Sequence, residues 1–421
     1  MNPYPLALAT DPVVPQRDEL MNLDAMARRL STITGRHGPV SIRSCHLSCV
    51  SYRPGKRVRV VYRLEVNGRE LQVAAGTFRS KSRGERAFLN AKENAYCAGD
   101  FRSVAYDSEL ETVFCIFPHD RRITNLSAVA GAHDDLTRLI NSPWATSRLV
   151  DYYPEASAVV ECLEDSGQIV AYAKVNAGDE GERTYRIQEV LARSAQSSRL
   201  QIARPLAYSK QFRTLMVEPI VGESIRSLTG ARLLAGLRAY GAALATLHSV
   251  PVNDGTWGIR DALGRLLHRA GGIRVVRPDA EEALVALLED LRLRWDEASD
   301  ERVFVHGDTN ENNAIVQGDR VALIDFDRTS LGPAGADLGN FLGLLRYYRI
   351  LDLITPQSEK ARAAAFLDGY ASVRPVPDRD SLRVHESAAL AERAVRAVTR
   401  LRARASQQIP SLLHEARELL R

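Results

Sequence analysis

Hydrophobic and polar residues follow two different periods along this chain, one in each half. In the first half they alternate, as over Ile169–Val175, and a period of two is typical of β-strands; Thr214–Val217 is a short apolar run that also predicts a strand. Further along, apolar residues recur every three or four positions, which predicts helices over Leu233–His248, Asp279–Ser299 and Glu386–Ala405. A strand-rich half followed by a helical half indicates an α+β fold.

The strand-rich half contains an internal repeat. Its motifs return about 100 residues later, at a nearly constant offset. We therefore interpret the region as one unit present twice, at about 40–130 and about 140–228. Each copy is expected to hold a pair of strands, a helix that begins at a Gly-Glu-Arg turn, and a hairpin. The matched motifs are Tyr52-Arg53-Pro54 with Tyr152-Tyr153-Pro154, Gly84-Glu85-Arg86 with Gly181-Glu182-Arg183, and Ala105-Tyr106 with Ala207-Tyr208.

Length and composition narrow the class of protein. With 421 residues the chain is long enough for several domains, and we expect units over 1–135, 136–226 and 227–421. The 56 basic and 52 acidic residues leave a formal net charge of only +4, which is too balanced for a nucleic-acid-binding protein. The sequence has no apolar run long enough to span a membrane, and its N-terminus lacks a signal-peptide pattern.

Cysteine usage favours a reducing, cytoplasmic environment. The five cysteines are odd in number and irregularly spaced, so they indicate no disulfide framework. Cys45 and Cys49 flank His46, but the sequence around them lacks the second ligand pair that a metal site needs, so we interpret them as strand cysteines. The five are Cys45, Cys49, Cys97, Cys115 and Cys162.

The most specific motif of the chain joins a polar loop to a predicted hairpin. Apolar runs at Ala314–Val316 and Val321–Ile324 lie on either side of Gln317-Gly318-Asp319-Arg320, which predicts two antiparallel strands and a tight turn. The loop and the far end of the hairpin read Val305-His306-Gly307-Asp308-Thr309-Asn310-Glu311-Asn312-Asn313 and Leu323-Ile324-Asp325-Phe326-Asp327.

This hairpin predicts a pair of oxygen ligands. A turn centred on Asp319 places Asn313 opposite Asp325, with Cβ atoms about 5 Å apart. An amide oxygen beside a carboxylate suits Mg²⁺, which proteins commonly share with substrate phosphates. Asp308 lies five residues before Asn313, where its carboxylate can accept the proton of an attacking hydroxyl. The motif therefore predicts metal-assisted phosphoryl transfer.

Protein kinases use a similar pattern, His-Arg-Asp-x-x-x-x-Asn followed by Asp-Phe-Gly. Here Gly307 replaces the arginine and Asp327 replaces the glycine. With His306-Gly307-Asp308 and Gly332-Pro333-Ala334-Gly335-Ala336-Asp337-Leu338, the chain resembles the aminoglycoside phosphotransferase and choline kinase family. The resemblance covers about residues 140–375 and reaches the first copy only through the repeat.

The resemblance implies a protein-kinase-like bilobal fold. An antiparallel-sheet small lobe would precede a mostly helical large lobe that holds the catalytic loop and the acceptor site. The additional N-terminal α+β unit would be a degenerate, duplicated small lobe that acts as a cap or shapes the substrate site, or a vestigial structural duplicate. It is similar to the extra unit of the capped maltokinase-like branch, although the Thr309–Asn312 stretch departs from that branch.

The resemblance also implies a nucleotide site in the second copy. Lys174 would hold the α- and β-phosphates of ATP, and Glu189 in the next helix would orient it, with Glu182 as the alternative. The first copy has Gly76-Thr77 at the corresponding place and is not expected to bind nucleotide. Backbone groups from Glu218 to Ile220 would bind the adenine, with Ile220 as donor because the intervening proline has no N–H.

Further roles follow from the same resemblance. Asp308 would be the catalytic base, and Asn313 and Asp325 would hold Mg²⁺. His306 would fix the backbone of the catalytic loop, and Asp337, at the start of a helix, would tie that loop down by hydrogen bonds. His248 is interpreted as a packed structural histidine.

The acceptor stays open at the level of the sequence. A hydroxyl of a sugar, an aminoglycoside-like compound or an amino alcohol is expected. The acidic residues of the Asp279–Ser299 helix are interpreted as a solvated face, with contact to an amino-substituted acceptor as the alternative. Most arginines of the Glu386–Ala405 helix are interpreted as surface charges, one or two of which could reach an anionic acceptor. The alternatives are a kinase of a peptide hydroxyl in natural-product modification and a nucleotide-binding pseudokinase. The choice between ATP and GTP and the oligomeric state are also open.

Overall fold

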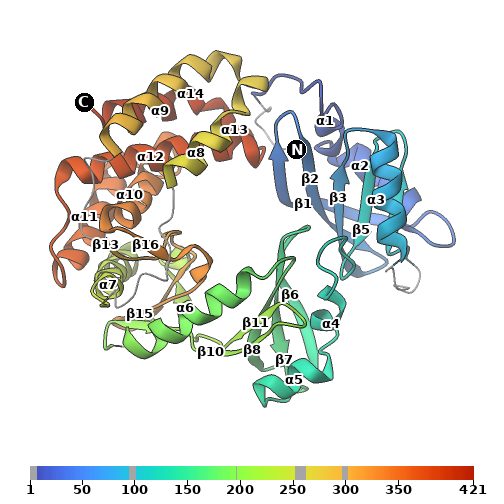
Figure 1. The fold of residues 1–421 in the computed structure, drawn as a ribbon, viewed down its shortest axis with the longest axis horizontal. Coiled ribbons are helices and arrows are strands. Elements are labelled where there is room, and N and C mark those ends of the chain that lie inside the picture. Colours follow the sequence, from blue (N-terminus) through green and yellow to red (C-terminus); the bar gives the residue numbers. More distant parts are fainter. Residues whose placement is uncertain (1–6, 94–100, 196, 252–261, 296–301) are drawn as a thin grey trace.

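A computed structural model describes residues 7–93, 101–195, 197–251, 262–295 and 302–421. Figure 1 shows two sheets and a helical part that follow one another around a ring-like outline. The ring closes where the N-terminal segment meets the helical part, since the Ala9 N–H donates to the Val276 carbonyl at 2.8 Å. This arrangement confirms the predicted α+β class. Among the described residues, no helix is both long enough and apolar enough to cross a membrane.

The first sheet is antiparallel and has the strand order β1-β2-β3-β5-β4. It is preceded by α1 and α2, and α3 connects β3 to β4. Cys45 and Cys49 lie half-buried in β1, as the sequence predicts for strand cysteines, whereas Cys97 lies outside the described residues. The elements are α1 (Gln16–Leu20), α2 (Leu23–Thr34), β1 (Ile42–Arg53), β2 (Arg57–Val66), β3 (Arg69–Thr77), α3 (Lys81–Glu93), β4 (Val104–Asp107) and β5 (Thr112–Ile116).

The second sheet repeats this topology, because its order β6-β7-β8-β11-β10 corresponds strand by strand to the first. Local contacts repeat as well. Thr112 and Thr214 each donate to a carbonyl two residues earlier, at 2.8 Å in both cases. The elements, with α4 and α5 linking the two sheets, are α4 (Leu126–Ala130), α5 (Asp134–Ile140), β6 (Thr146–Tyr153), β7 (Ser157–Leu163), β8 (Ile169–Asn176), α6 (Glu180–Ser194), β10 (Pro205–Ser209) and β11 (Thr214–Val217).

Each copy also has a buried aspartate that binds the turn of the first hairpin, here called the aspartate clasp, which was not predicted from the sequence. Asp11 accepts hydrogen bonds from the Tyr52 hydroxyl and the Gly55 N–H, at 2.5 and 2.8 Å. Asp120 accepts from the Tyr152 hydroxyl and the Glu155 N–H in the same way, at 2.7 and 2.9 Å. Each clasp fixes the turn of its first hairpin. The sequence feature that could have revealed it is an Asp whose carboxylate accepts from the N–H groups two and three residues later. It occurs in Asp11-Pro12-Val13-Val14 and Asp120-Arg121-Arg122-Ile123.

The remaining chain forms the helical part with two small sheets. The four-stranded sheet has the order β12-β14-β15-β9, and β13 pairs with β16. The elements are β9 (Leu200–Ile202), β12 (Glu223–Ser224), α7 (Gly230–His248), α8 (Ala262–Ala270), α9 (Glu281–Trp295), β13 (Arg302–Val305), β14 (Ala314–Gln317), β15 (Arg320–Leu323), β16 (Ser330–Pro333), α10 (Ala334–Ile350), α11 (Pro356–Ala371), α12 (Arg379–Thr399), α13 (Ala403–Gln407) and α14 (Ile409–Glu418).

The predicted C-terminal helix is wrong in both bounds. Instead of running over Glu386–Ala405, α12 begins after Asp378, whose carboxylate accepts from the N–H groups of Asp380 and Ser381. It ends before Leu401, which has a φ of 47° and so cannot continue a right-handed helix. The chain resumes in α13, so the predicted single helix is two separate helices, of 21 and 5 residues.

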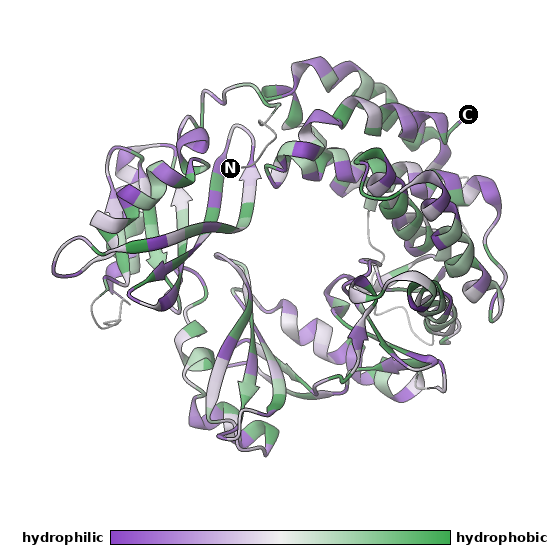
Figure 2. Cartoon of the chain, turned by 180° about the vertical axis from the view of Figure 1, so that it is seen from behind, coloured by the Kyte–Doolittle hydropathy of each residue, from purple (hydrophilic) through white to green (hydrophobic). Residues whose placement is uncertain are grey.

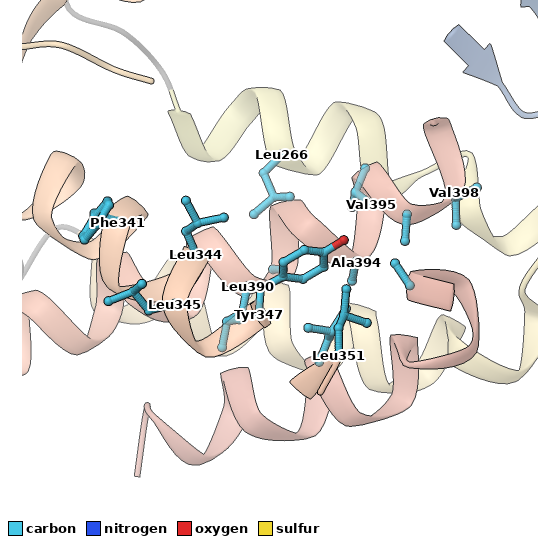
Figure 3. Close-up of a cluster of buried hydrophobic side chains, with 14 of the residues drawn as sticks. Leu266, Phe341, Leu344, Leu345, Tyr347, Leu351, Leu390, Ala394, Val395 and Val398 are labelled. Carbon is cyan, nitrogen blue, oxygen red and sulfur yellow. The ribbon is translucent and has the colours of Figure 1, made fainter. Parts of the chain in front are cut away.

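Helices α8, α10 and α12 share the hydrophobic core of the helical part. Figure 3 shows their side chains interleaved, with Leu266 from α8, Phe341 and Leu344 from α10, and Leu390 and Val395 from α12. In Figure 2 the helices carry hydrophobic residues where they meet one another and hydrophilic residues on outer faces. This is the pattern that the helical period in the sequence predicts.

A buried carboxylate joins this core to the loop after β13. Asp337, 1 % exposed in the first turn of α10, accepts from the backbone N–H groups of His306 and Gly307 at 2.6 and 2.8 Å. The Nε2–H of His248 donates to the same carboxylate at 3.1 Å, and Nδ1 forms a hydrogen bond with the Tyr370 hydroxyl at 3.0 Å. Helices α7, α10 and α11 thereby hold one loop, and His248 is structural as predicted.

Burial alone would raise the pKa of the Asp337 carboxyl. The hydrogen bond and charge of His248, together with the charge of His306 and the Gly307 N–H, outweigh it and place the pKa below the ordinary value of 3.8. A carboxyl with a depressed pKa stabilises the folded state above its unfolded pKa, and that stabilisation disappears as the pH falls through the folded pKa.

We predict that Asp337→Asn lowers the free energy of unfolding by about 3 kcal/mol at neutral pH, because it removes the charged acceptor from a buried network. The variant should also lose less stability than the wild type when the pH falls below about 4. Chemical denaturation at a series of pH values measures both effects. Asp368→Asn, on an exposed part of α11, is the control. Equal stability of the wild type and Asp337→Asn would contradict this role.

Candidate active site

The loop from His306 to Asn313 starts where β13 ends and leads into β14. Its tight entry requires glycine at position 307, which has a φ of 77° and whose added Cβ would lie 2.5 Å from the Arg328 carbonyl oxygen. The side chain of His306 reaches forward, with Nε2 at 2.9 Å from the Ile324 carbonyl. The histidine therefore braces the loop against the end of the hairpin, the scaffold role expected for it.

Asp308 lies at the mouth of this loop, partly exposed. Its Oδ1 is 3.3 Å from Arg328 Nη1 and 4.0 Å from Arg396 Nη2, so two guanidinium groups face it. The side-chain amide of Asn313 donates to the Asp308 carbonyl at 3.0 Å and lies 3.5 Å from Oδ2. The structure therefore brings Asp308 and Asn313 together at one end of the hairpin.

The predicted register of this hairpin is wrong by one position. Its two-residue turn consists of Gly318, with a φ of 66°, and Asp319, so Ala314 pairs with Leu323. Asn313 is consequently opposite Ile324, whose N–H donates to the Asn313 carbonyl at 3.1 Å, and Asp325 lies one residue beyond. A shift of one residue would normally turn a side chain to the opposite face of the hairpin. Asp325 does not continue the strand, because it adopts a left-handed conformation with a φ of 63°.

Lys174 reaches across from β8 to the end of the hairpin. Its ammonium lies 3.2 Å from Asp325 Oδ1 and 2.5 Å from Asp327 Oδ2. Burial would lower the pKa of Lys174, but the two carboxylates outweigh it and raise this pKa. Burial would raise the pKa of Asp325, but the charges of Lys174 and His306 keep it below its ordinary value. The shifts keep Lys174 and Asp325 charged at neutral pH, so this ion pair joins the two lobes.

The predicted orientation of Lys174 by a helix glutamate is wrong in this structure. Glu189 of α6 pairs with Arg193 one turn later, at 3.3 Å, and Glu182 pairs with Arg186 at 2.5 Å. Both are i,i+4 pairs on the helix surface, where such contacts form easily. Among the described residues, Lys174 has its ion pairs with Asp325 and Asp327 instead.

The connector after β11 presents the groups expected to face a base. The Glu218 N–H donates to the Arg204 carbonyl at 3.0 Å, and the Glu218 side chain accepts from the Arg204 N–H at 2.9 Å. Glu218 is therefore fixed within the protein. Two residues on, Ile220 is only partly buried, and its N–H has no acceptor among the described residues.

The donor set around the hairpin fits a hard cation. Asn313 and Asp325 offer an amide and a carboxylate oxygen, and Asp327 adds a second carboxylate beside Asp325, with the Lys174 ammonium bound to both. Within the described ranges no group of three or more His, Cys, Asp and Glu residues gathers as a complete metal site. A metal at this place would thus need ligands from a substrate, as Mg²⁺ bound to a nucleotide has.

A cavity of about 450 Å³ opens beside Asp308, between β16 and the helices α8, α10 and α12. Arg269 and Arg396 lie on its wall and pair with Glu392, at 3.3 and 2.8 Å. Burial would raise the pKa of Glu392, but Arg396, Arg328 and Arg269 lower it to about 2. Of the arginines in the predicted Glu386–Ala405 helix, Arg396 therefore lies on the wall of this cavity, whereas Arg269 comes from α8.

Comparisons with known proteins agree with this geometry. A model of the phosphotransferase enzyme family matches residues 172–385, about half of the chain. No curated protein matches. Aminoglycoside phosphotransferase APH(4)-Ia is structurally similar, with a TM-score of 0.51, 17% identity, and coverage of 69% of this chain and 99% of that one. A thermostable mutant of that enzyme, solved as a ternary complex with ADP and hygromycin B, gives a TM-score of 0.51 at 16% identity, with 69% and 98% covered.

A Plasmodium vivax ethanolamine kinase is also among the similar structures, with a TM-score of 0.46, 12% identity, and coverage of 64% of this chain and 82% of that one. The fold shared with APH(4)-Ia is the kinase-like fold that the sequence predicts. The match to the family model over residues 172–385 identifies the chain as a member of the phosphotransferase enzyme family.

Proposed function

We propose that this protein transfers the γ-phosphate of ATP to a hydroxyl group of a small molecule, with Mg²⁺ as the metal. The observation that carries the proposal is the ion pair between Lys174 and Asp325, because it joins a cation of the small lobe to a carboxylate beside the catalytic loop. In kinases those two positions bind the phosphates and the metal. Family membership and the shared fold support the same chemistry.

Each residue has a defined task in this proposal. Asp308 accepts the proton of the acceptor hydroxyl, whose oxygen attacks the γ-phosphorus while the bond to the bridging oxygen of ADP breaks. Lys174 leaves its carboxylate partners to bind the α- and β-phosphates. Asn313 and Asp325 hold Mg²⁺, which supplies charge neutralisation when bound. The adenine is held at the connector by the Ile220 N–H and the fixed backbone of Glu218.

The division of the chain follows from these tasks. We assign residues 136–226 to the nucleotide-binding lobe and 227–421 to the lobe with the catalytic loop and acceptor site. Residues 1–135 form the degenerate copy, which has Gly76 in β3 where β8 has Lys174. Strand pairing supports this equivalence, because Gly76 pairs with Val113 of β5 and Lys174 pairs with Leu215 of β11.

The cavity beside Asp308 favours an acceptor that carries negative charge. Arg328 and Arg396 face both Asp308 and the cavity, and Arg269 adds a third guanidinium. Aminoglycosides and amino alcohols are cations at neutral pH, and these guanidinium groups would repel them. The acidic residues of α9 do not compensate within the described range, since Glu289 is exposed and Asp290 pairs with Arg417 at 3.1 Å.

We predict that Asp308→Asn lowers kcat by at least about 100-fold, because the variant has no group to accept the proton of the hydroxyl. Binding of Mg·ATP should persist and should still raise the melting temperature. ADP release and thermal shift measure the two effects. Asp319→Asn, in the exposed turn of the same hairpin, is the control. Unchanged turnover in Asp308→Asn would disprove the assigned base, and no thermal shift with Mg·ATP in the wild type would favour a pseudokinase.

A second prediction concerns the acceptor. In a matched series of glucose, glucosamine, gluconate and glucose 6-phosphate, we expect the anionic members to stimulate ADP release most. Arg269→Gln should raise KM for the stimulating anion about tenfold, because it removes one charge-assisted contact. Arg238→Gln is a matched control, since this exposed arginine of α7 also pairs with a carboxylate, at 3.4 Å. Stimulation by glucosamine alone would contradict the anionic class but leave the kinase assignment intact.

A further inference from the structure

The turn between β6 and β7 leaves its own sheet and enters the first copy. Its residues Pro154 and Glu155 line a small pocket together with Gly76 of β3. Gly76 holds the strand position that Lys174 holds in the second copy. A Cβ built on Gly76 would lie 3.9 Å from Glu155 Oε1. The carboxylate of Glu155 thus lies in the space into which a lysine at position 76 would project.

Two arginines bind this carboxylate on both of its oxygens. Arg121 donates from Nε to Oε1 at 3.0 Å, and its Nη2 lies 2.7 Å from Oε2. Arg59 forms an ion pair with Oε2 from β2, where it is the neighbour of Gly76 across the sheet. The side chains of Glu155 and Arg59 are only 9% and 11% exposed. Charge-assisted contacts of this kind, partly shielded from water, fix both position and orientation.

The backbone of the turn is also held, by a hydrogen bond to Asp120. Glu155 has a φ of 60°, a left-handed conformation that non-glycine residues rarely adopt, and the first copy has Gly55 with a φ of 66° at this place. The Glu155 N–H donates to the Asp120 clasp at 2.9 Å. A glutamate at a position that favours glycine indicates that its side chain is needed there.

The strand that leads into this turn lies on the side of the active site, because Arg400, which contacts Tyr153, follows Arg396 by one turn at the end of α12, and Arg396 faces Asp308. The guanidinium of Arg400 lies 5.1 Å from the centre of the Tyr153 ring and donates to the Val50 carbonyl at 2.9 Å, so it joins the end of β6 to the first copy. Burial raises the pKa of Asp151, and the charges of Lys174 and Asp325 act on it as well. In kinases the first hairpin of the small lobe covers the phosphates of the nucleotide. This chain has no glycine-rich sequence in that hairpin, so another structure must define the shape of the turn.

We infer that the first copy binds this turn and holds it in place over the nucleotide. Its pocket beside Gly76, which we call the socket, binds the Glu155 carboxylate through Arg59 and Arg121. Gly76 stands where the second copy has Lys174, and Arg59, whose counterpart in the second copy is Val159, supplies a cation from the neighbouring strand. Glu155, Arg59 and Arg121 are positioning residues for the nucleotide and take no part in proton transfer. The effect on ATP rests on the proposed function, whereas the socket itself does not.

The test is Arg59→Met in the full-length chain. This change lies entirely in the first copy, and it removes one partner of Glu155 while keeping a side chain of similar length. We expect KM for Mg·ATP to rise at least about fivefold, with kcat and KM for the acceptor changed less than twofold, because only the preorganisation of the nucleotide site is lost. Arg43→Met is the matched control, since Arg43 of β1 forms an exposed pair with Glu65 at 3.1 Å.

A second measurement needs no nucleotide. Hydrogen exchange at the Glu155 and Ala156 amides should be slow in the wild type and about tenfold faster in Arg59→Met. Glu155→Gln combined with Arg59→Met should affect KM no more than either change alone, because both act through one contact. If Arg59→Met does not fold, Arg121→Met, at a more exposed position, replaces it.

The outcomes separate the two proposals. Unchanged exchange and unchanged KM for Mg·ATP in a folded Arg59→Met variant would overturn the socket. A uniform loss of kcat with no change in KM would also overturn it, since a merely structural defect lowers the amount of active enzyme. If the wild type binds no nucleotide but its turn exchanges slowly and depends on Arg59, the socket stands and the kinase assignment fails.

Discussion

The buried charge of Asp337 is the constraint on which the catalytic region depends. A carboxylate removed from water is costly unless donors surround it, and here the donors are two backbone N–H groups of the loop and the ring of His248. These donors come from α7 and from the loop after β13, while the carboxylate comes from α10. The three segments must therefore meet at one point. The position of Asp308 follows, because it lies directly after the two residues whose N–H groups are held.

The two copies of the small lobe have the same scaffold but different side chains at the place of Lys174. Both keep the same strand order and the same aspartate clasp, which are the features that stabilise the sheet and its first turn. One of the positions at which they differ is the strand position where Lys174 in one copy corresponds to Gly76 in the other. Losing a long cation opens space in the sheet, and a neighbouring segment with a carboxylate can fill it. The architecture survives this change because the clasp and the strand ladder do not involve that position.

Much of the fold and part of the site could be predicted from local sequence. The period of two identified β8, an apolar run identified β11, and the turn residues identified the hairpin that carries Asn313. The predicted register of this hairpin was wrong because a two-residue turn and a three-residue turn have similar sequences. The two turns shift the pairing of the strands by one position relative to each other. The predicted partner of Lys174 was wrong because a long side chain can reach several carboxylates, and the spacing of glutamates along a helix does not determine which one it binds. The wall of arginines needs α8 and α12 to lie side by side, which no local pattern reveals.

The two-residue turn at Gly318 and Asp319 has a consequence for how this chain can change over evolutionary time. Both turn residues are exposed, so Asp319 can be exchanged with little effect. The number of residues in the turn, by contrast, cannot change without an effect on the site. An insertion or deletion would slide β14 against β15 and move Asn313 relative to Asp325. Substitutions at this turn thus leave the site in place, whereas a change in the number of residues between Asn313 and Asp325 would displace one of these side chains from the other.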